Sequence, residues 1–264
     1  MEWIDTHTHL FLAEFDADRD EVIQRALQAG VRYMLLPNID ENSLQALYAC
    51  TQQYAYCCRA MLGLHPCSVH ENVTGQLQII ARAFNEKKFV AIGEIGLDYY
   101  WDTRYREQQL QAFRTQLQWA AEWQLPVSIH SRSALDDCIQ EIKQLQRGQL
   151  TGVFHCFTGT LQQARQIIDL GFALGIGGVI TFQKSTALRE TISQISLQHI
   201  VLETDAPYLS PVPFRGKRNE SSRIPCIAQT LASLFHCEEQ EIARITTANA
   251  LRIFPTLVED MQHK

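Results

Sequence analysis

The sequence predicts an α/β fold, a single (β/α)8 TIM-type barrel over residues 1–264. Short apolar runs rich in β-branched residues alternate with longer amphipathic stretches along the chain. Expected strands begin roughly 20 to 37 residues apart, about the length of one strand–helix unit. Eight such units in about 250 residues is the usual size of this barrel. A doubly wound open sheet is the competing architecture, but it rarely needs eight strands at so even a spacing.

Each expected strand is a short apolar run. We expect strands at 3–5, 31–36, 60–64, 89–94, 126–129, 152–156, 172–176 and 200–204. The clearest expected helix covers residues 107–123. Its apolar face, at helical spacing, consists of Leu110, Phe113, Leu117 and Ala121. No Gly/Ser/Pro-rich linker divides the chain, so the residues from Ser222 onward are expected to be helices that cover the barrel.

The composition excludes several classes of protein. With 46% hydrophobic and 20% charged residues it is ordinary for a globular protein, which argues against disorder and fibrous repeats. No apolar run approaches the roughly 20 residues that cross a bilayer, so no membrane partner is expected. The N-terminus lacks a secretory signal, and the eight cysteines are expected to be reduced thiols in a cytoplasmic protein. A net charge of −6 argues against a protein that coats nucleic acid, and no obligate protein partner is indicated.

Two histidines directly after the first expected strand are the first indication of chemistry. In an extended chain residues i and i+2 point to the same side, so His7 and His9 can reach one metal ion. Taken alone, the His-x-His pattern is only moderately specific, and two structural histidines would explain it equally well. The positions of other ionisable residues favour the metal site.

Four further ionisable residues lie at the ends of other expected strands. They are Glu94, His130, His155 and Asp205, at the fourth, fifth, sixth and eighth strands. The carboxyl ends of barrel strands meet at one face, so these side chains are expected to converge with His7 and His9. Six ligands are too many for one zinc with an open position but suit two metals about 3.5 to 4 Å apart. Mixed imidazole and carboxylate ligands accept Zn, Mn, Ni or Mg.

Six short motifs follow one another through the chain. They are Asp5-Thr6-His7-Thr8-His9-Leu10, Gly63-Leu64-His65-Pro66, Gly93-Glu94-Ile95-Gly96-Leu97-Asp98-Tyr99, Ile129-His130-Ser131-Arg132, His155-Cys156-Phe157-Thr158-Gly159 and Glu203-Thr204-Asp205-Ala206-Pro207-Tyr208-Leu209. In this order they resemble the TatD family of metal-dependent deoxyribonucleases, within the amidohydrolase-like metallo-barrels. The resemblance runs nearly end to end, and six motifs in register are highly specific.

The resemblance implies Mg-dependent hydrolysis of DNA phosphodiester bonds, often as a 3′→5′ exonuclease. It implies two divalent ions per chain, with Mn or Zn as alternatives to Mg. One ion would be held by His7, His9 and Asp205 and the other by His130 and His155, with Glu94 between them. Asp205 corresponds to the carboxylate that orients or deprotonates the nucleophilic water, so Asp205 and Glu94 are the expected catalytic residues.

Four side chains are expected to contact the substrate. His65 matches a family histidine at the rim of the site, which implies contact with a phosphate. Arg132 is expected at the pocket mouth, where it suits a phosphate; an exposed arginine without that role is the alternative. Arg215 and Lys217 belong to the net +3 stretch 213–225, which is either a phosphate-binding rim or a solvated polar loop.

Two sets of neighbouring residues have two interpretations each. Glu203 and Asp5 each precede a candidate ligand by two residues, and either orient a ligand histidine or fill a polar layer of the barrel. Tyr99, Tyr100 and Trp101 follow the fourth strand, and either stack on an unpaired base or pack against the barrel top.

The sequence therefore predicts a divalent-metal-dependent hydrolase of DNA phosphodiester bonds, a 3′→5′ exodeoxyribonuclease that uses a water activated by two metals. Its expected substrates are single strands or strand ends. The alternative is a small-molecule amidohydrolase or phosphodiesterase on the same barrel. Many amidohydrolases bridge their metals with a carboxylated lysine from the fourth strand, whereas this chain has Glu94 there. A non-enzymatic scaffold is the third hypothesis, and six intact ligands argue against it.

Overall fold

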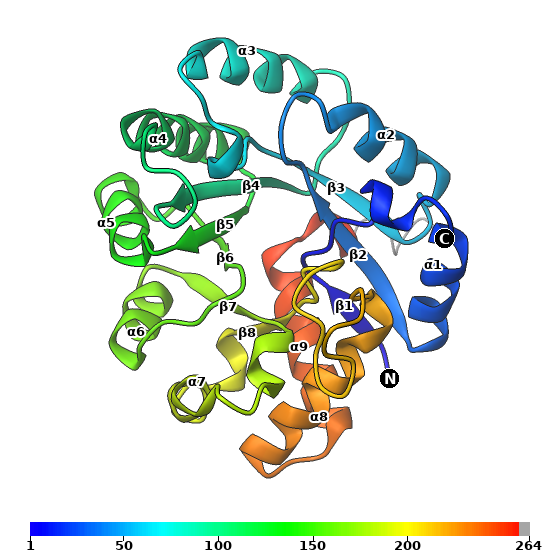
Figure 1. Cartoon of the computed structure of the whole chain (residues 1–264). Coiled ribbons are helices and arrows are strands. Elements are labelled where there is room, and N and C mark those ends of the chain that lie inside the picture. The colour runs from blue at the N-terminus through cyan, green and yellow to red at the C-terminus, as the bar shows by residue number, and fades with distance from the viewer. Residues whose placement is uncertain (259–264) are drawn as a thin grey trace.

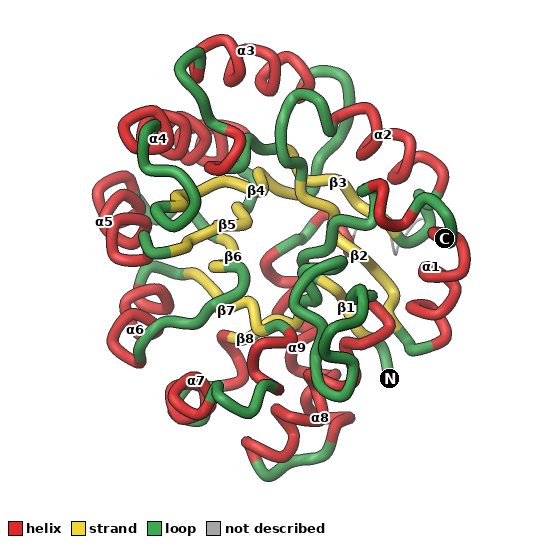
Figure 2. Tube along the Cα trace, viewed as in Figure 1, coloured by secondary structure: helices red, strands yellow, loops and turns green. Residues whose placement is uncertain are grey.

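Parallel strands follow one another around a single sheet in chain order, as Figures 1 and 2 show. The structure, a computed structural model, describes residues 1–258, and the end of the predicted domain, 259–264, lies outside them. The strands are β1 (Trp3–Asp5), β2 (Val31–Pro37), β3 (Cys58–Leu62), β4 (Ala91–Asp98), β5 (Val127–Arg132), β6 (Gly152–Phe154), β7 (Phe172–Ile176) and β8 (Ile200–Leu202). This eight-stranded parallel sheet confirms the predicted α/β barrel class.

Helices alternate with the strands and form an outer ring (Figure 1). The α-helices of the described residues are α1 (Arg19–Gln28), α2 (Leu44–Gln53), α3 (Val73–Phe84), α4 (Arg106–Trp123), α5 (Leu135–Leu145), α6 (Leu161–Asp169), α7 (Thr186–Ile192), α8 (Ile224–Phe235) and α9 (Glu239–Ile253). Short 3-10 turns lie at Ala13–Phe15, Pro66–Ser68, Gly178–Thr181, Leu197–His199 and Ser221–Arg223. Among residues 1–258, none of the helices combines the length and hydropathy of a membrane span.

The first and last strands meet through backbone bonds beyond their ends. The Thr6 amide donates to the Leu202 carbonyl at 3.0 Å, and the His9 amide donates to the Ala206 carbonyl at 2.7 Å. In the other direction, the Asp205 amide donates to the His7 carbonyl at 2.9 Å. The segment after β8 therefore lies beside the segment after β1, and this brings two groups of predicted ligands together.

The clearest expected helix, 107–123, is confirmed almost to the residue, since α4 covers Arg106–Trp123. Phe113 and Leu117 are fully buried, as their spacing predicts. The same face also buries Gln116, whose side-chain amide group bonds to both the amide and the carbonyl of Leu64. A buried amide is stable there because both of its polar atoms have backbone partners.

Two apolar layers hold the barrel. The larger lies between the strands and the surrounding helices, and the smaller fills the barrel interior. The interior layer includes Ile4, Tyr33 and Leu35 from the strands and Phe254 and Leu257 from the segment after α9. Figure 1 shows α9 behind the barrel opening. The C-terminal helices thus cover the barrel as predicted and leave the carboxyl ends of the strands open.

Strand ends differ from the prediction at the candidate site. Glu94 was expected to end the fourth strand, but β4 continues to Asp98. A β-bulge is the reason: Ile92 pairs with Val127 and Ile95 with Ile129, so β4 has one extra residue in this interval. Pairing with β5 then resumes, and β4 extends beyond Glu94 while its carboxylate is aimed into the barrel mouth.

Three other predicted ligands are also displaced from their strand ends. His130 lies two residues before the end of β5, because β5 remains paired with β4 through Arg132. His155 and Asp205 lie beyond β6 and β8, which end at Phe154 and Leu202. Asp205 has a left-handed backbone, with φ of 56°, so an extended strand cannot pass through it. The expected strands 152–156 and 200–204 were therefore too long.

Candidate metal centre

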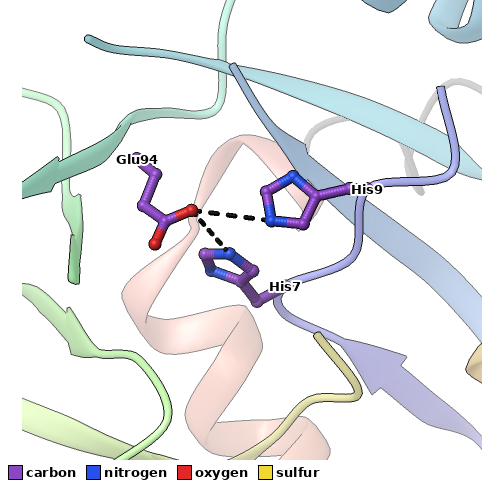
Figure 3. A group of neighbouring side chains, drawn as sticks. All are labelled: His7, His9 and Glu94. Carbon is purple, nitrogen blue, oxygen red and sulfur yellow. Dashed lines mark hydrogen bonds and ion pairs between the residues drawn. The ribbon is translucent and has the colours of Figure 1, made fainter. Parts of the chain in front are cut away.

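The segment that follows β1 aims two histidine rings at one carboxylate oxygen. Oε2 of Glu94 lies 3.1 Å from Nε2 of His7 and 3.6 Å from Nε2 of His9 (Figure 3). On the other side of His9, the same nitrogen lies 3.5 Å from Oδ1 of Asp205. His7, His9 and Asp205 thus lie together as expected, and that they hold one metal ion stays a prediction.

The second oxygen of Glu94 faces three more rings. Oε1 lies 3.0 Å from Nδ1 of His130, 3.5 Å from Nε2 of His155 and 3.4 Å from Nε2 of His65. These rings come from β5, from the segment after β6 and from the segment after β3. Only 3% of the Glu94 side chain is exposed. All six predicted ligands thus converge, and His65, expected at the rim, lies beside them.

Outer hydrogen bonds decide which ring nitrogen carries a proton. Nε2 of His130 lies 2.8 Å from Oδ2 of Asp98, and Nδ1 of His155 lies 3.0 Å from Oε1 of Glu203. An ionised carboxylate only accepts hydrogen bonds, so each of these nitrogens carries a hydrogen. Despite burial, the facing carboxylates raise the pKa of both rings, so each inner nitrogen readily holds a second proton toward Glu94. A metal ion would displace that proton and find a lone pair on each inner nitrogen, while the outer nitrogens keep theirs.

His65 has the opposite arrangement. Its Nδ1 accepts a hydrogen bond from the Cys67 amide at 3.0 Å, so the proton of the neutral ring lies on Nε2. That N–H points at Oε1 of Glu94. His65 therefore reaches the centre as a hydrogen-bond donor, whereas His130 and His155 would offer lone pairs once a metal ion displaced their inner protons.

Glu203 and Asp5 have different contacts. Oε1 of Glu203 bonds to the His155 ring and also accepts the Cys156 amide at 2.6 Å, so Glu203 orients a candidate ligand. Asp5 instead accepts the Thr204 amide at 2.9 Å and the Thr204 hydroxyl at 2.6 Å. Asp5 thus links the backbone after β1 to that after β8. Burial raises the pKa of Asp5 to about 7.

Asp98 belongs to the site but had no predicted role. Besides His130, it bonds through Oδ1 to the amides of Tyr100 and Trp101 at 2.9 and 3.0 Å. Gln109 of α4 holds the backbone of Asp98 at both its amide and its carbonyl. The available signal in the sequence was a carboxylate four residues after Glu94 in the same motif.

The electrostatics favour positive charge at the centre. Burial alone would raise the pKa of Glu94, but the surrounding histidines, His65 and His7 foremost, hold it well below its usual range. Burial lowers the pKa of His7, and repulsion from His155 lowers it further. For His155 the burial effect is outweighed by Glu203 and Glu94, which raise its pKa to about 10.

The donors present fit divalent metal ions. An ionised carboxylate cannot partner the inner nitrogens of neutral His130 and His155, because lone pairs would then face lone pairs. Nδ1 of His9 is buried and has no hydrogen-bond partner among the described residues. Two compact groups share Glu94, one with His7 and His9 and the other with His130 and with His65, which is a hydrogen-bond donor there rather than a ligand. Such a donor set suits Zn, Mn, Ni or Mg.

A cavity of about 500 Å³ opens above the centre. Arg132, Trp101 and Tyr208 line it together with the candidate ligands other than His7, which is fully buried below it. Arg215 and Lys217, which were expected to contact substrate, are not among its lining residues. The guanidinium of Arg215 packs over the Phe182 ring at 3.8 Å, which accounts for its position.

Known proteins share the sequence pattern and the barrel of this chain. The chain matches the model of the TatD-related DNase family over residues 4–255. It belongs to that family. Among relatives, the uncharacterized metal-dependent hydrolase YabD of Bacillus subtilis is 36% identical over 250 residues, which cover 95% of this chain and 98% of that protein.

Further TatD-family proteins support the assignment. A protein of Erwinia amylovora named 3′-5′ ssDNA/RNA exonuclease TatD is 34% identical, over 95% of this chain and 98% of that protein. The crystal structure of YjjV, a TatD homolog from Escherichia coli, matches with a TM-score of 0.89 at 33% identity, and the match covers 96% of this chain and 98% of that chain. The predicted family and fold are confirmed. Several of these relatives, YabD among them, are named as metal-dependent hydrolases.

Proposed function

We propose that this chain hydrolyses DNA phosphodiester bonds as a divalent-metal-dependent 3′→5′ exonuclease. One observation carries the proposal: the buried carboxylate of Glu94 lies within 3.6 Å of five histidine rings at the floor of an open cavity. The exonuclease activity in the name of the Erwinia amylovora relative supports the choice of substrate. A cytoplasmic location stays a prediction of the sequence.

The metal ligands in this proposal are the six residues predicted from the sequence. They are His7, His9, Glu94, His130, His155 and Asp205. Two divalent ions, with Mg favoured and Mn or Zn as alternatives, would neutralise charge on the phosphate and make water more acidic. The outer partners Glu203 and Asp98 keep the lone pairs of two of these histidines pointing inward.

Asp205 is the proposed proton acceptor. Its side chain is 15% exposed, against 3% for Glu94, and it lines the cavity. Although burial alone would raise its pKa, the hydrogen bond to His9 and the nearby His155 lower it. Asp205 is therefore ionised at neutral pH and can accept the proton of an attacking water from the cavity.

Two further side chains are proposed to hold the phosphate. His65 lies at the cavity floor, where a metal-bound Glu94 would leave the N–H on its Nε2 free for a phosphate oxygen, and Arg132 presents a guanidinium at the cavity wall. A phosphodiester carries one negative charge, and donors of this kind stabilise charge on its oxygens during transfer. Arg215 and Lys217 would contact only a longer strand that leaves the cavity.

The test is hydrolysis of labelled single-stranded DNA by metal-stripped protein refilled with Mg, Mn or Zn. A 3′→5′ exonuclease shortens a 5′-labelled strand stepwise and releases a 3′ label at once as a mononucleotide. Glu94→Gln should reduce the rate at least about 100-fold, since a carboxylate among five rings is lost. Glu122→Gln, at an exposed position of α4, is the matched control and should retain the full rate.

Two outcomes would contradict this proposal. Full turnover by a folded, metal-loaded Glu94→Gln protein would remove Glu94 from the mechanism. If wild-type protein cuts no strand with any of the three metals, the nuclease assignment is wrong, and the small-molecule amidohydrolase or phosphodiesterase becomes the better hypothesis.

A further inference from the structure

Two large aromatic side chains stand exposed beside the metal centre. Tyr100 is 58% exposed and Trp101 is 68% exposed, in a chain that buries most of its large apolar side chains. Their rings lie edge to face, with centroids 5.0 Å apart. The guanidinium of Arg132 lies 3.9 Å from the Tyr100 centroid and 5.0 Å from that of Trp101. The three side chains therefore form one continuous surface of flat groups, here named the aromatic platform.

Packing of the loop does not account for this surface. Tyr99, the preceding residue, is the one that packs: its hydroxyl bonds to Asp137 at 3.0 Å, and Arg106 covers its ring at 4.3 Å. Tyr100 and Trp101 instead keep more than half of their surface exposed. Of the two interpretations of this aromatic run, packing against the barrel top describes Tyr99. It does not describe Tyr100 and Trp101, whose rings are mainly exposed to solvent.

The aromatic platform has a fixed position relative to the chemistry. Oδ1 of Asp98 accepts the amides of Tyr100 and Trp101, and Oδ2 of the same carboxylate bonds to His130. The rings are thus anchored through one side chain to a candidate metal ligand. A group bound on the platform would be held at a set distance from the phosphate at the cavity floor.

A third exposed ring, that of Tyr208, lines the cavity that Trp101 also lines, from another wall. Tyr208 is 50% exposed and lies after β8, whereas the aromatic platform follows β4. In the strand order of the barrel, β4 and β8 are four strands apart, so the loops that follow them lie on opposite sides of the barrel mouth (Figure 2). A flat group that enters the cavity thus meets aromatic surface on two sides.

We propose that the aromatic platform of Tyr100, Trp101 and Arg132 stacks on an unpaired nucleobase next to the scissile phosphate and so selects single-stranded nucleic acid. This inference rests on the proposed nuclease function. Aromatic faces and guanidinium planes bind bases of any sequence, because every base has a flat π face. Internal bases of a duplex are covered on both faces by their neighbours, so only a base released from the helix can occupy the platform.

The experiment compares an ordinary single strand with the same strand made abasic at its three terminal nucleotides. Trp101→Ala should lower kcat/KM on the ordinary strand about tenfold, the usual effect of losing one stacking partner. On the abasic strand the same variant should match wild type within about twofold, because no base remains to stack. Trp101→Phe, which keeps a ring, should recover most of the activity.

Tyr56→Ala is the control. Tyr56 is 45% exposed but lies between α2 and β3, at the amino end of the strands and away from the cavity. This variant should cut both strands at the wild-type rate. An equal loss on both strands by Trp101→Ala, or no loss on either, overturns the proposal.

A binding measurement keeps this inference separate from the proposed function. Fluorescence anisotropy with the same two strands is measured on Glu94→Gln protein with and without Trp101→Ala. The second change should weaken binding of the ordinary strand about tenfold and leave binding of the abasic strand unchanged. If wild type cuts no strand, the proposed nuclease function is wrong, but this binding test still shows whether the aromatic platform binds a base. Equal binding of the ordinary strand by the proteins with and without Trp101→Ala would reject the base-stacking proposal.

Discussion

Oδ2 of Asp98 lies 2.8 Å from Nε2 of His130, and through its other oxygen the same carboxylate holds the backbone of the aromatic platform. Burial alone would raise the pKa of Asp98, but the hydrogen bond from His130 lowers it. Asp98 is therefore an ionised acceptor that fixes the proton of His130 on the outer nitrogen. One side chain thus orients a candidate metal ligand and positions a candidate base-binding surface.

Asp98→Asn should reduce turnover by about 10- to 100-fold, the usual effect of removing the outer partner of a ligand histidine. The amide can still accept from the Trp101 backbone but no longer provides a charged acceptor for His130. The measurements are kcat on single-stranded DNA and the Mn concentration for half-maximal rate. Asp102→Asn is the control, because Asp102 lies on the same loop and forms only an exposed ion pair with Arg104. This variant should behave as wild type. Unchanged kcat and metal dependence in Asp98→Asn would contradict this role.

Gly175→Ala should disturb Glu203 and, through it, His155. A Cβ at Gly175 would overlap Oε2 of Glu203, whereas a Cβ at Gly177 would meet its nearest atom at an ordinary 3.6 Å. We expect Gly175→Ala to lose about 1–3 kcal/mol of stability through overpacking and about 10- to 100-fold in kcat. Gly177→Ala is the matched control. Thermal unfolding and single-turnover rates check both, and equal behaviour of the two variants would show that Glu203 does not depend on this space.

Metal removal should destabilise the protein, because ligands that bind only the folded state raise its stability. At 100 times Kd one ion contributes about 2.7 kcal/mol, which corresponds to roughly 5–10 °C in Tm for a chain of this size. We expect Mn or Mg to raise Tm over an EDTA-treated sample, and Glu94→Gln to remove most of the increase. Differential scanning calorimetry measures this. An identical Tm with Mg, Mn, Zn and EDTA would argue against a metal centre.

Acid should weaken the attachment of the loop after β8 to α1. Arg25 bonds to Glu220 through two nitrogens, at 2.8 and 3.0 Å. Burial alone would raise the pKa of Glu220, but Arg25 lowers it below its ordinary value of 4.5. Because the folded pKa lies below the unfolded one, this stabilisation is present above about pH 4.5 and is lost as the pH falls through the folded value.

The size of this effect is modest, since 44% of the Arg25 side chain is exposed. Glu220→Gln should cost about 0.5–1 kcal/mol at pH 7, or about 1–3 °C in Tm. The difference from wild type should shrink as the pH falls below about 4.5. Glu122→Gln, at an exposed position of α4, should show no such difference. A gap in Tm that stays constant from pH 7 to pH 3 would refute the electrostatic origin.

Much of the fold follows from local pattern. The periods of strands and helices predicted the eight units, and α4 agrees with its predicted range to one residue. The boundaries around the site were less predictable. Glu94 lies inside β4 because a bulge opposite β5 re-aims it, and a bulge depends on the partner strand. Asp205 leaves the strand geometry because its backbone is left-handed.

The sequence by itself determined the barrel, the family and the six residues that converge, because strand ends in a parallel barrel share one face. Only the tertiary structure decided their roles. The proton position on His65, the link from Asp98 to His130 and the position of Arg215 outside the cavity lining depend on contacts between separate segments. Spacing along a strand fixes the side on which a residue lies. Which atoms face one another across the barrel is set by register, bulges and packing, which no single segment contains.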